Sequence, residues 1–200
     1  SIAKHQDDPT AKYCQLATAA IGGGASCRTW VFRGFWDNTN ALKFITDRRS
    51  DKVAEIAADP VGEVVFYLRK TREQFRIKGR LIVVSASESD EQLIKARNQQ
   101  WKQISPASKA SFATSHIPGL ELSAQENSDA TSTTDEQKGR GEEIEVVDIP
   151  DTVENFSLVL LWPYNVDHLV LKDGQHRYVH SLVKEHDEIF PVWKTVAVNP

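Results

Sequence analysis

The stretch CRTWVFRGF (residues 27–35), together with TDRRSDK (46–52) and REQFRIKG (72–79), decides how this chain is interpreted. Each piece places basic or amide side chains on, or next to, a predicted strand or helix start. The side chains concerned are those of Arg28, Arg33, Lys52 and Gln74. Together the three pieces predict a site for a phosphorylated, planar cofactor.

The local pattern of each piece predicts its structure. Residues 27–35 form a strand with Arg28, Trp30 and Phe32 on one face and Arg33 on the other. Ser50 is expected to begin a helix that ends at Asp59-Pro60 and buries Val53, Ile56 and Ala57. Residues 74–84 form a strand whose polar face carries Gln74, Arg76, Lys78 and Arg80; of these, Gln74 is the candidate ligand contact.

Outside this stretch, short strands are expected at 13–20, 41–46, 64–68, 156–162, 166–172, 177–183 and 192–198. Helices are expected at about 89–104, after a capping box at Ser89, and at 107–112. Residues 1–12 are expected to form a fraying arm. Because the strands do not alternate regularly with helices, the pattern favours a mainly β fold, an antiparallel closed or nearly closed barrel with peripheral helices.

The chain of 200 residues is expected to form a single domain, residues 1–200, with a flexible acidic insertion at about 121–148. The stretch from Glu121 to Glu145 holds eight acidic and two basic residues and almost no apolar ones. The insertion is interpreted as a tolerated surface excursion; a lid or a partner-docking segment is the alternative.

Composition excludes several classes of function. The net charge of −4 and the pI of about 5.9 argue against a nucleic-acid binder that works by bulk charge. No apolar run is long enough to cross a bilayer, so we expect no membrane partner and a location in the cytoplasm, or in an organelle stroma or matrix if a transit peptide is removed. No Cys/His cluster has metal-ligand spacing. A hairpin centred on Gly22–Gly24 would set Cys14 opposite about Phe32 and Cys27 opposite about Thr18, so we expect no disulfide between them.

The helix start at Ser50 is a natural anion site, because its first amide groups are unpaired and its dipole is positive there. Lys52 adds a cation one turn in, and Arg28 could give a bidentate phosphate contact. Arg33 and Gln74 could then donate to the polar edge of a ring.

Three motifs, in order and spacing, resemble the pyridoxamine 5'-phosphate oxidase-like, FMN-binding split-barrel family. They are residues 27–35, then FITD (44–47) with RSDK (49–52) and Asp59-Pro60, then EQFRIKG (73–79). The similarity covers about residues 13–84 and thins beyond. The form TDxRSxK is most similar to the cyanobacterial and plant branch described as oxidase-like.

The resemblance implies FMN as cofactor and an antiparallel split barrel. Its implied cofactor contacts are Arg28, Trp30, Val31, Arg33, Ile45, Thr46, Ser50, Lys52 and Gln74, with Trp30 and Val31 acting through the backbone. The nearest counterparts of the family's substrate contacts are Arg33, Arg97, Arg177 and His180. It also implies a homodimer with the flavin site at the interface between the two subunits.

This chain departs from the family pattern mainly outside the cofactor motifs. Asp51 stands where the family has an Arg, although Arg49 is close enough to compensate, and Leu171 and Ser181 stand where true oxidases carry a Trp and an Arg. The segment from Arg177 to His180 is one residue longer than the family's Arg-x-His.

Three functions follow as hypotheses. The first is an FMN-dependent oxidase of pyridoxamine or pyridoxine 5'-phosphate, in which substrate gives a hydride to FMN and oxygen reoxidises it. The second is an FMN- or haem-binding split-barrel protein without B6 oxidase activity. The third is a non-catalytic dimeric interaction protein.

Overall fold

Strands dominate the computed structural model, which describes residues 2–121, 153–172, 174–184 and 190–200. Within these residues the strands are β1 (Tyr13–Ala19), β2 (Ala25–Val31), β3 (Leu42–Asp47), β4 (Val61–Leu68), β5 (Glu73–Val84), β6 (Phe156–Val170), β7 (His176–Val183) and β8 (Val192–Val198). The helices are α1 (Asp51–Ala58), α2 (Glu91–Gln103) and α3 (Pro106–Ala113), with two short 3-10 helices at Ile2–His5 and Pro9–Lys12. None of these helices is long and apolar enough to span a membrane.

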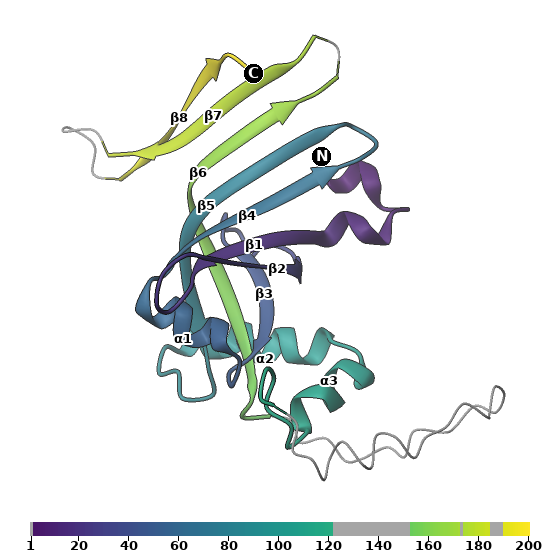
Figure 1. Ribbon diagram of the computed structural model, residues 1–200, viewed down its shortest axis with the longest axis vertical. Coiled ribbons are helices and arrows are strands. Elements are labelled where there is room, and N and C mark those ends of the chain that lie inside the picture. Colours follow the sequence, from purple (N-terminus) through teal and green to yellow (C-terminus); the bar gives the residue numbers. More distant parts are fainter. Residues whose placement is uncertain (1, 122–152, 173, 185–189) are drawn as a thin grey trace, which may run out of the picture.

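The strands form one antiparallel sheet with the order β2-β1-β4-β5-β6-β7-β8, and β3 pairs with β6. The segment that follows β2 returns to β3: the Arg33 amide donates to the Lys43 carbonyl at 2.9 Å, and the Lys43 amide to the Gly34 carbonyl at 2.8 Å. β1, β2, β3, β6, β5 and β4 therefore enclose a barrel, with α1, α2 and α3 gathered at one end of the molecule (Figure 1). The predicted antiparallel barrel with peripheral helices is confirmed.

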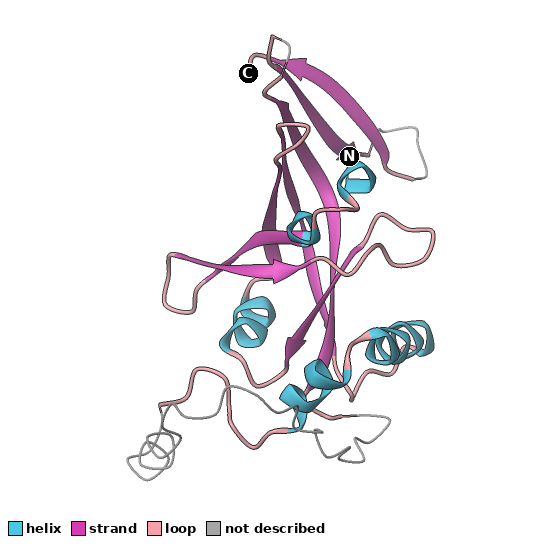
Figure 2. Cartoon of the chain, turned by 90° about the vertical axis from the view of Figure 1, so that its right-hand side faces the viewer, coloured by secondary structure: helices cyan, strands magenta, loops and turns pink. Residues whose placement is uncertain are grey.

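β6 is shared between the barrel and a second part of the sheet. Its first half pairs with β3 through residues 156–161, and its second half pairs with β7 through residues 165–170. We call β7, β8 and residues 165–170 the wing; it extends from the barrel at the end away from α1, α2 and α3 (Figures 1 and 2). The sequence predicted two strands here, at 156–162 and 166–172, and the structure corrects them to one.

An irregularity in the β5–β6 pairing marks where the wing begins. Lys78 faces Asn165 and Gly79 faces Pro163, so Tyr164 has no partner in the ladder. A Cβ on Gly79 would lie 2.4 Å from the Trp162 carbonyl oxygen, so the two strands approach too closely there for a side chain.

Alternating apolar residues of the barrel strands meet in one core. β1 contributes Cys14 and Leu16, and β2 and β3 contribute Trp30 and Phe44, whose rings meet edge to face at 5.3 Å. Ile56 of α1 packs against the same core. A second cluster joins the α2–α3 pair to the start of β6 through Trp101, Ile104, Phe112, Val153 and Phe156.

Several local expectations are corrected. The N-terminal segment is folded into 3-10 turns with His5 buried, so it is no fraying arm. Asp90, not Ser89, caps α2, with its carboxylate accepting from the amides of Gln92 and Leu93. On α1 the buried pair is Glu55 and Ile56, because the helix turns Glu55 toward the barrel and leaves Ala57 exposed.

The β1–β2 hairpin is shifted from its expected register. Cys14 faces Trp30 and Cys27 faces Ala17, because the chain folds back around Gly22 rather than Gly23. Both cysteines are free, Cys14 buried and Cys27 exposed. The predicted acidic insertion falls almost wholly on residues 122–152, outside the described residues.

Candidate functional site

A cavity of about 250 Å³ lies between β2 and β3, beside the first turn of α1. We call it the β2–β3 cavity. It exists because these two strands are joined by hydrogen bonds only beyond the end of β2, and α1 follows directly after β3. Its lining residues are Arg28, Thr29, Trp30, Val31, Arg33, Ile45, Thr46 and Lys52.

All of the predicted cofactor contacts except Ser50 and Gln74 line this cavity. Ser50 lies directly behind it, with its hydroxyl 3.2 Å from that of Thr46. Gln74 lies on β5, paired with Tyr67 and Leu169, and is not part of the lining. Thr29 was not predicted; as an exposed residue between two site residues on the same strand, it could have been inferred from its position alone.

Ser50 occupies the N-cap position of α1 without capping it. Its hydroxyl donates to the Asp47 carbonyl at 2.7 Å, and its side chain makes no cap hydrogen bond. Because of this, the first amide groups of α1 receive no side-chain acceptor from Ser50 and remain available to an anion.

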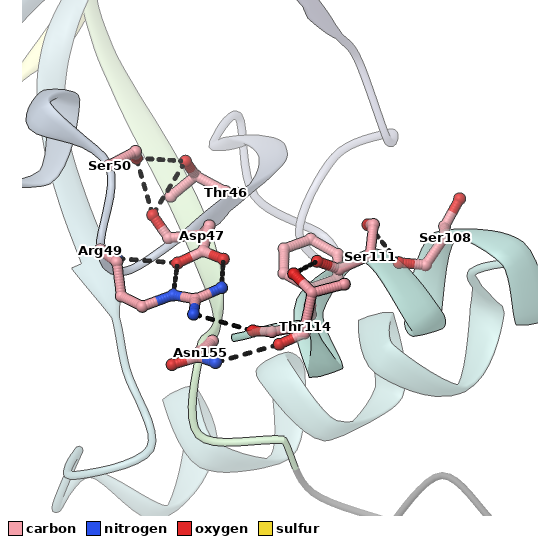
Figure 3. A network of polar contacts seen from close by, with 9 residues as sticks. Thr46, Asp47, Arg49, Ser50, Ser108, Ser111, Thr114 and Asn155 are labelled. Carbon is pink, nitrogen blue, oxygen red and sulfur yellow. Dashed lines mark hydrogen bonds and ion pairs between the residues drawn. The ribbon is translucent and has the colours of Figure 1, made fainter. Parts of the chain in front are cut away.

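A polar network fixes the loop that leads into α1 (Figure 3). Arg49 forms a bidentate pair with Asp47 at 3.0 and 2.7 Å and also donates to the Thr114 carbonyl at the end of α3 at 2.9 Å. Asn155 donates to the neighbouring Phe112 carbonyl at 3.0 Å. Arg49 therefore holds this loop against α3. These contacts argue against the expectation that Arg49 compensates for the family's Arg, whose position Asp51 occupies in this chain.

Arg28 is held by a buried cluster that the sequence did not reveal. Its guanidinium donates to Glu55 at 2.6 Å, to the Ser26 carbonyl at 3.0 Å, and to the hydroxyls of Thr18 and Ser26. The Thr18 hydroxyl in turn donates to Glu55 at 2.6 Å. The sequence offered one signal for this cluster, which is Glu55 next to the apolar Ile56 in α1. A carboxylate that is buried with such a neighbour requires a hydrogen-bonding or charged partner.

The cavity carries a surplus of positive charge. Burial, and then the nearby Arg28, lower the pKa of Lys52, and within the described residues Lys52 forms no ion pair. The Nε atom of Arg33 is buried without a hydrogen-bond partner. Three cations, Arg28, Arg33 and Lys52, thus line the cavity with no carboxylate among its lining residues, and this donor set fits a phosphate group. The carboxylates that act on the pKa of Lys52 lie outside this lining; they are Glu55, which pairs with Arg28, Asp47, which pairs with Arg49, and Asp51.

The charge state of Glu55 follows from its contacts. Burial by itself would raise its pKa, but hydrogen bonds from Thr18, Arg28 and Ser26 outweigh burial and lower it. Glu55 is thus ionised at neutral pH, and it offsets only part of the charge of Arg28 and Lys52.

The residues predicted to bind substrate are not brought together. Arg97 is 4% exposed and donates to the carbonyls of Val153 and Phe156, so its position argues against a substrate contact. Arg177 forms a bidentate pair with Asp167 at 2.9 and 2.7 Å. His180 contacts Thr195 and, three residues along β7, faces the opposite side of the sheet from Arg177.

Two other cavities are apolar. The first, of about 330 Å³, lies between the wing and the barrel and offers His180 and Asn40 among mostly apolar residues. The second, of about 260 Å³, lies under Ile2 and Ala3 and is lined by Phe32, Phe66 and Phe75 among others. Neither offers the cations that a phosphate requires.

Comparison with known proteins identifies relatives of the whole chain. The family description "Pyridoxamine 5'-phosphate oxidase, FMN-binding domain" matches residues 1–85. Pyridoxine/pyridoxamine 5'-phosphate oxidase 2 of Arabidopsis thaliana is 32% identical over 188 residues, which cover 94% of this chain and 87% of that protein. The pyridoxine/pyridoxamine 5'-phosphate oxidase of Polynucleobacter asymbioticus is 37% identical over 76 residues, 38% of this chain and 35% of its own length.

Solved structures agree with this grouping. A pyridoxamine 5'-phosphate oxidase-related, FMN-binding protein of Nostoc punctiforme has a TM-score of 0.79 and 34% identity, with 100% of this chain and 93% of that chain covered. PhzG of Burkholderia lata, at a TM-score of 0.69 and 19% identity over 100% of this chain and 88% of its own, shares the fold.

Proposed function

This chain belongs to the pyridoxamine 5'-phosphate oxidase FMN-binding family, and on that premise we propose that it is an FMN-dependent oxidoreductase whose flavin phosphate enters the β2–β3 cavity. The observation that carries this proposal is the surplus of cations in that cavity beside the uncapped start of α1. A phosphate dianion supplies the negative charge that Glu55 alone does not.

The residues of the cavity divide the work of holding FMN. Lys52 and the first amides of α1 hold the phosphate, with the hydroxyls of Thr46 and Ser50 beside them. Arg28 already uses four of its five N–H donors on Thr18, Ser26 and Glu55. The bidentate contact expected from Arg28 is therefore reduced to its remaining Nε–H, and Lys52 becomes the leading cation.

When bound, FMN supplies the hydride acceptor for the reaction. The protein's part is to position the ring and to set the charge around it. Trp30 is buried in the core against Phe44, so it offers the cavity its backbone rather than its indole. Arg33, with its unpaired Nε, would place a cation beside the ring, where it would stabilise negative charge on the flavin.

A second copy of the chain completes the site in this proposal. The β2–β3 cavity, at about 250 Å³, is smaller than the roughly 300–1,000 Å³ typical of ligand cavities. Gln74 lies outside it and would serve the cavity of the partner subunit. Large apolar side chains exposed on the barrel and the wing offer a surface for that contact: Phe35, Trp162, Tyr164, Trp193 and Val196.

We propose a phosphorylated B6 vitamer as substrate, which the name of the Arabidopsis relative supports. The second candidate is an FMN-binding protein of this fold that oxidises no B6 vitamer. The neutralised Arg177 and the buried Arg97 favour the second candidate, because neither presents a free cation to a substrate phosphate.

Anaerobic titration of the FMN-loaded protein distinguishes the two. Addition of pyridoxine 5'-phosphate or pyridoxamine 5'-phosphate is expected to bleach the flavin absorbance, and addition of air to restore it. The unphosphorylated vitamers serve as matched controls. If the protein binds FMN but neither phosphorylated vitamer bleaches it, the proposed substrate is wrong. If the protein binds no FMN, the proposed cofactor is wrong.

A further inference from the structure

The buried carboxylate of Glu55 stands behind the β2–β3 cavity and has no role in the function proposed above. We propose that Glu55 is a positioning residue, which fixes Arg28 and thereby makes the site select flavins that carry a phosphate. This inference rests on the proposed function, since it assigns the phosphate to the same cavity.

The geometry places Glu55 behind the cations rather than among them. Glu55 is 6% exposed and does not line the cavity, whereas Arg28 and Lys52 do. Its carboxylate is covered by Arg28 at 2.6 Å and by the Thr18 hydroxyl at 2.6 Å. An entering phosphate therefore meets the cations first, with the guanidinium between it and Glu55.

The cluster restricts Arg28 from three sides. Glu55 comes from α1, Thr18 from β1 and Ser26 from β2, and the bonds to these residues use both terminal nitrogens of the guanidinium. A free arginine side chain would lose much rotamer freedom on binding a phosphate. Here that freedom is already lost in the folded chain, so the donor that remains is preorganised.

Glu55 also permits two cations to share one small cavity. Arg28 and Lys52 are close enough for the charge of Arg28 to lower the pKa of Lys52, while the charge of Glu55 raises it. Without that carboxylate the two cations would repel each other with less compensation, so that either cation would be displaced from the cavity or Lys52 would lose its charge. The positioning of Arg28 and the retention of charge on Lys52 therefore depend on the same side chain.

The test measures FMN and riboflavin affinity by quenching of flavin fluorescence, because riboflavin lacks only the phosphate. In Glu55→Gln, which keeps the size and removes the charge, FMN affinity is expected to fall on the order of tenfold, the effect of one hydrogen bond to a charged group. Riboflavin affinity is expected to stay within about twofold, because the ring contacts remain.

Thr18 provides a second, milder variant should Glu55→Gln fold poorly. Thr18→Val removes the hydroxyl that bridges Arg28 and Glu55, and it is expected to weaken FMN by a few-fold, with riboflavin unchanged. Thr18→Ser restores the hydroxyl and is expected to recover wild-type FMN affinity. Thermal unfolding of each apoprotein shows whether the fold is kept.

Two outcomes overturn the inference. Unchanged FMN binding in Glu55→Gln shows that the carboxylate does not support phosphate binding, and tighter binding shows that it repels the phosphate. An equal loss of FMN and riboflavin affinity shows that Glu55 supports the fold alone. Failure of the proposed function has a different signature, in which the wild-type protein itself binds FMN no better than riboflavin or binds neither.

Discussion

The β2–β3 cavity and the wing both carry basic side chains on strands, but they differ in charge balance. The cavity is lined by Arg28, Arg33 and Lys52 and by no carboxylate, and of these three cations Arg28 alone forms an ion pair within the described residues, with Glu55 behind the cavity. On the face of the sheet that continues into the wing, Arg177 and Arg76 each have a carboxylate partner. Arg177 pairs with Asp167 at 2.7 Å, and Arg76 bonds Glu63 at 2.7 Å and lies 3.6 Å from Asp167.

This difference shows why the number of basic residues is a poor guide to an anion site. The wing holds one arginine, Arg177, whose charge is already satisfied, and a phosphate would have to displace a carboxylate to reach it. Of the three cations that line the cavity, Arg33 and Lys52 form no ion pair within the described residues. This difference supports the proposal that the cofactor phosphate binds in the cavity rather than on the wing.

Removing the cations of the cavity should give the largest effect. In the double variant Arg28→Ala with Lys52→Ala, FMN affinity is expected to fall by roughly 10²–10⁴-fold, since two charge-assisted contacts of about 1.5–3 kcal/mol each are lost. Fluorescence quenching measures the effect. Lys78→Ala is the matched control, because Lys78 is a half-exposed cation 3.6 Å from Glu63 and outside the cavity. Equal FMN affinity in the double variant and the control would contradict the proposal that the FMN phosphate binds in the cavity.

The junction between the two regions can be broken at Gly79. Gly79→Ala brings a Cβ to 2.4 Å from the Trp162 carbonyl oxygen, and backbone cannot move aside cheaply. We expect the free energy of unfolding to fall by about 1–3 kcal/mol, measured by urea denaturation.

Gly62, the cross-strand partner of Gly79, provides the comparison. There the closest contact of an added Cβ, at 2.5 Å, is with the end of the Leu81 side chain, which can adopt another rotamer. Gly62→Ala should therefore cost less than Gly79→Ala. The reverse order would show that the approach of β5 to β6 is not the constraint.

The sequence was informative where function depends on neighbours along the chain. Alternation placed Trp30 and Arg33 on opposite faces of one strand, and the order of the first two motifs brought Arg28, Thr46 and Lys52 to one cavity. These residues lie on consecutive elements, so local pattern was sufficient.

The sequence was uninformative where function depends on partners far away in the chain. The pairing of Glu55 with Arg28 requires the packing of α1 on β1, and the pairing of Arg177 with Asp167 requires the register of β6 and β7. The predicted break in β6 failed for the same reason, because Pro163 and Asn165 resemble a turn locally and the ladder to β5 carries the strand through them.

Titration of Lys52 should make FMN binding depend on pH at the alkaline side. Its pKa lies below the ordinary value of 10.5, through burial and the proximity of Arg28. Only the protonated amine attracts phosphate, so affinity is complete below the pKa of the folded apoprotein and is lost as pH rises through it. We expect a loss on the order of tenfold, one charged contact, with riboflavin affinity unchanged.

The stability of the apoprotein should change in the opposite direction. Between the lowered pKa of Lys52 and 10.5, the unfolded chain binds more protons than the folded one, so this group's contribution to the free energy of unfolding rises with pH. Lys52→Arg is the control for both measurements, since arginine keeps its charge throughout. If the Lys52→Arg protein loses FMN at the same pH as wild type, the group that titrates is not Lys52.

Arg177→Gln should give the smallest effect and tests the wing directly. Because Asp167 already neutralises Arg177, FMN affinity should stay within about twofold, and the free energy of unfolding should fall only slightly, as for other solvent-screened ion pairs. The hydrogen bond from Arg177 is the main cause of the lowered pKa of Asp167, so the stability of the pair is present above the ordinary pKa of that carboxyl and lost as pH falls through the lowered one. Arg177→Gln should therefore shift the acid unfolding midpoint upward. A tenfold rise in KM for a phosphorylated vitamer, with acid unfolding unchanged, would instead place a substrate phosphate on Arg177 and show that Asp167 releases it on binding.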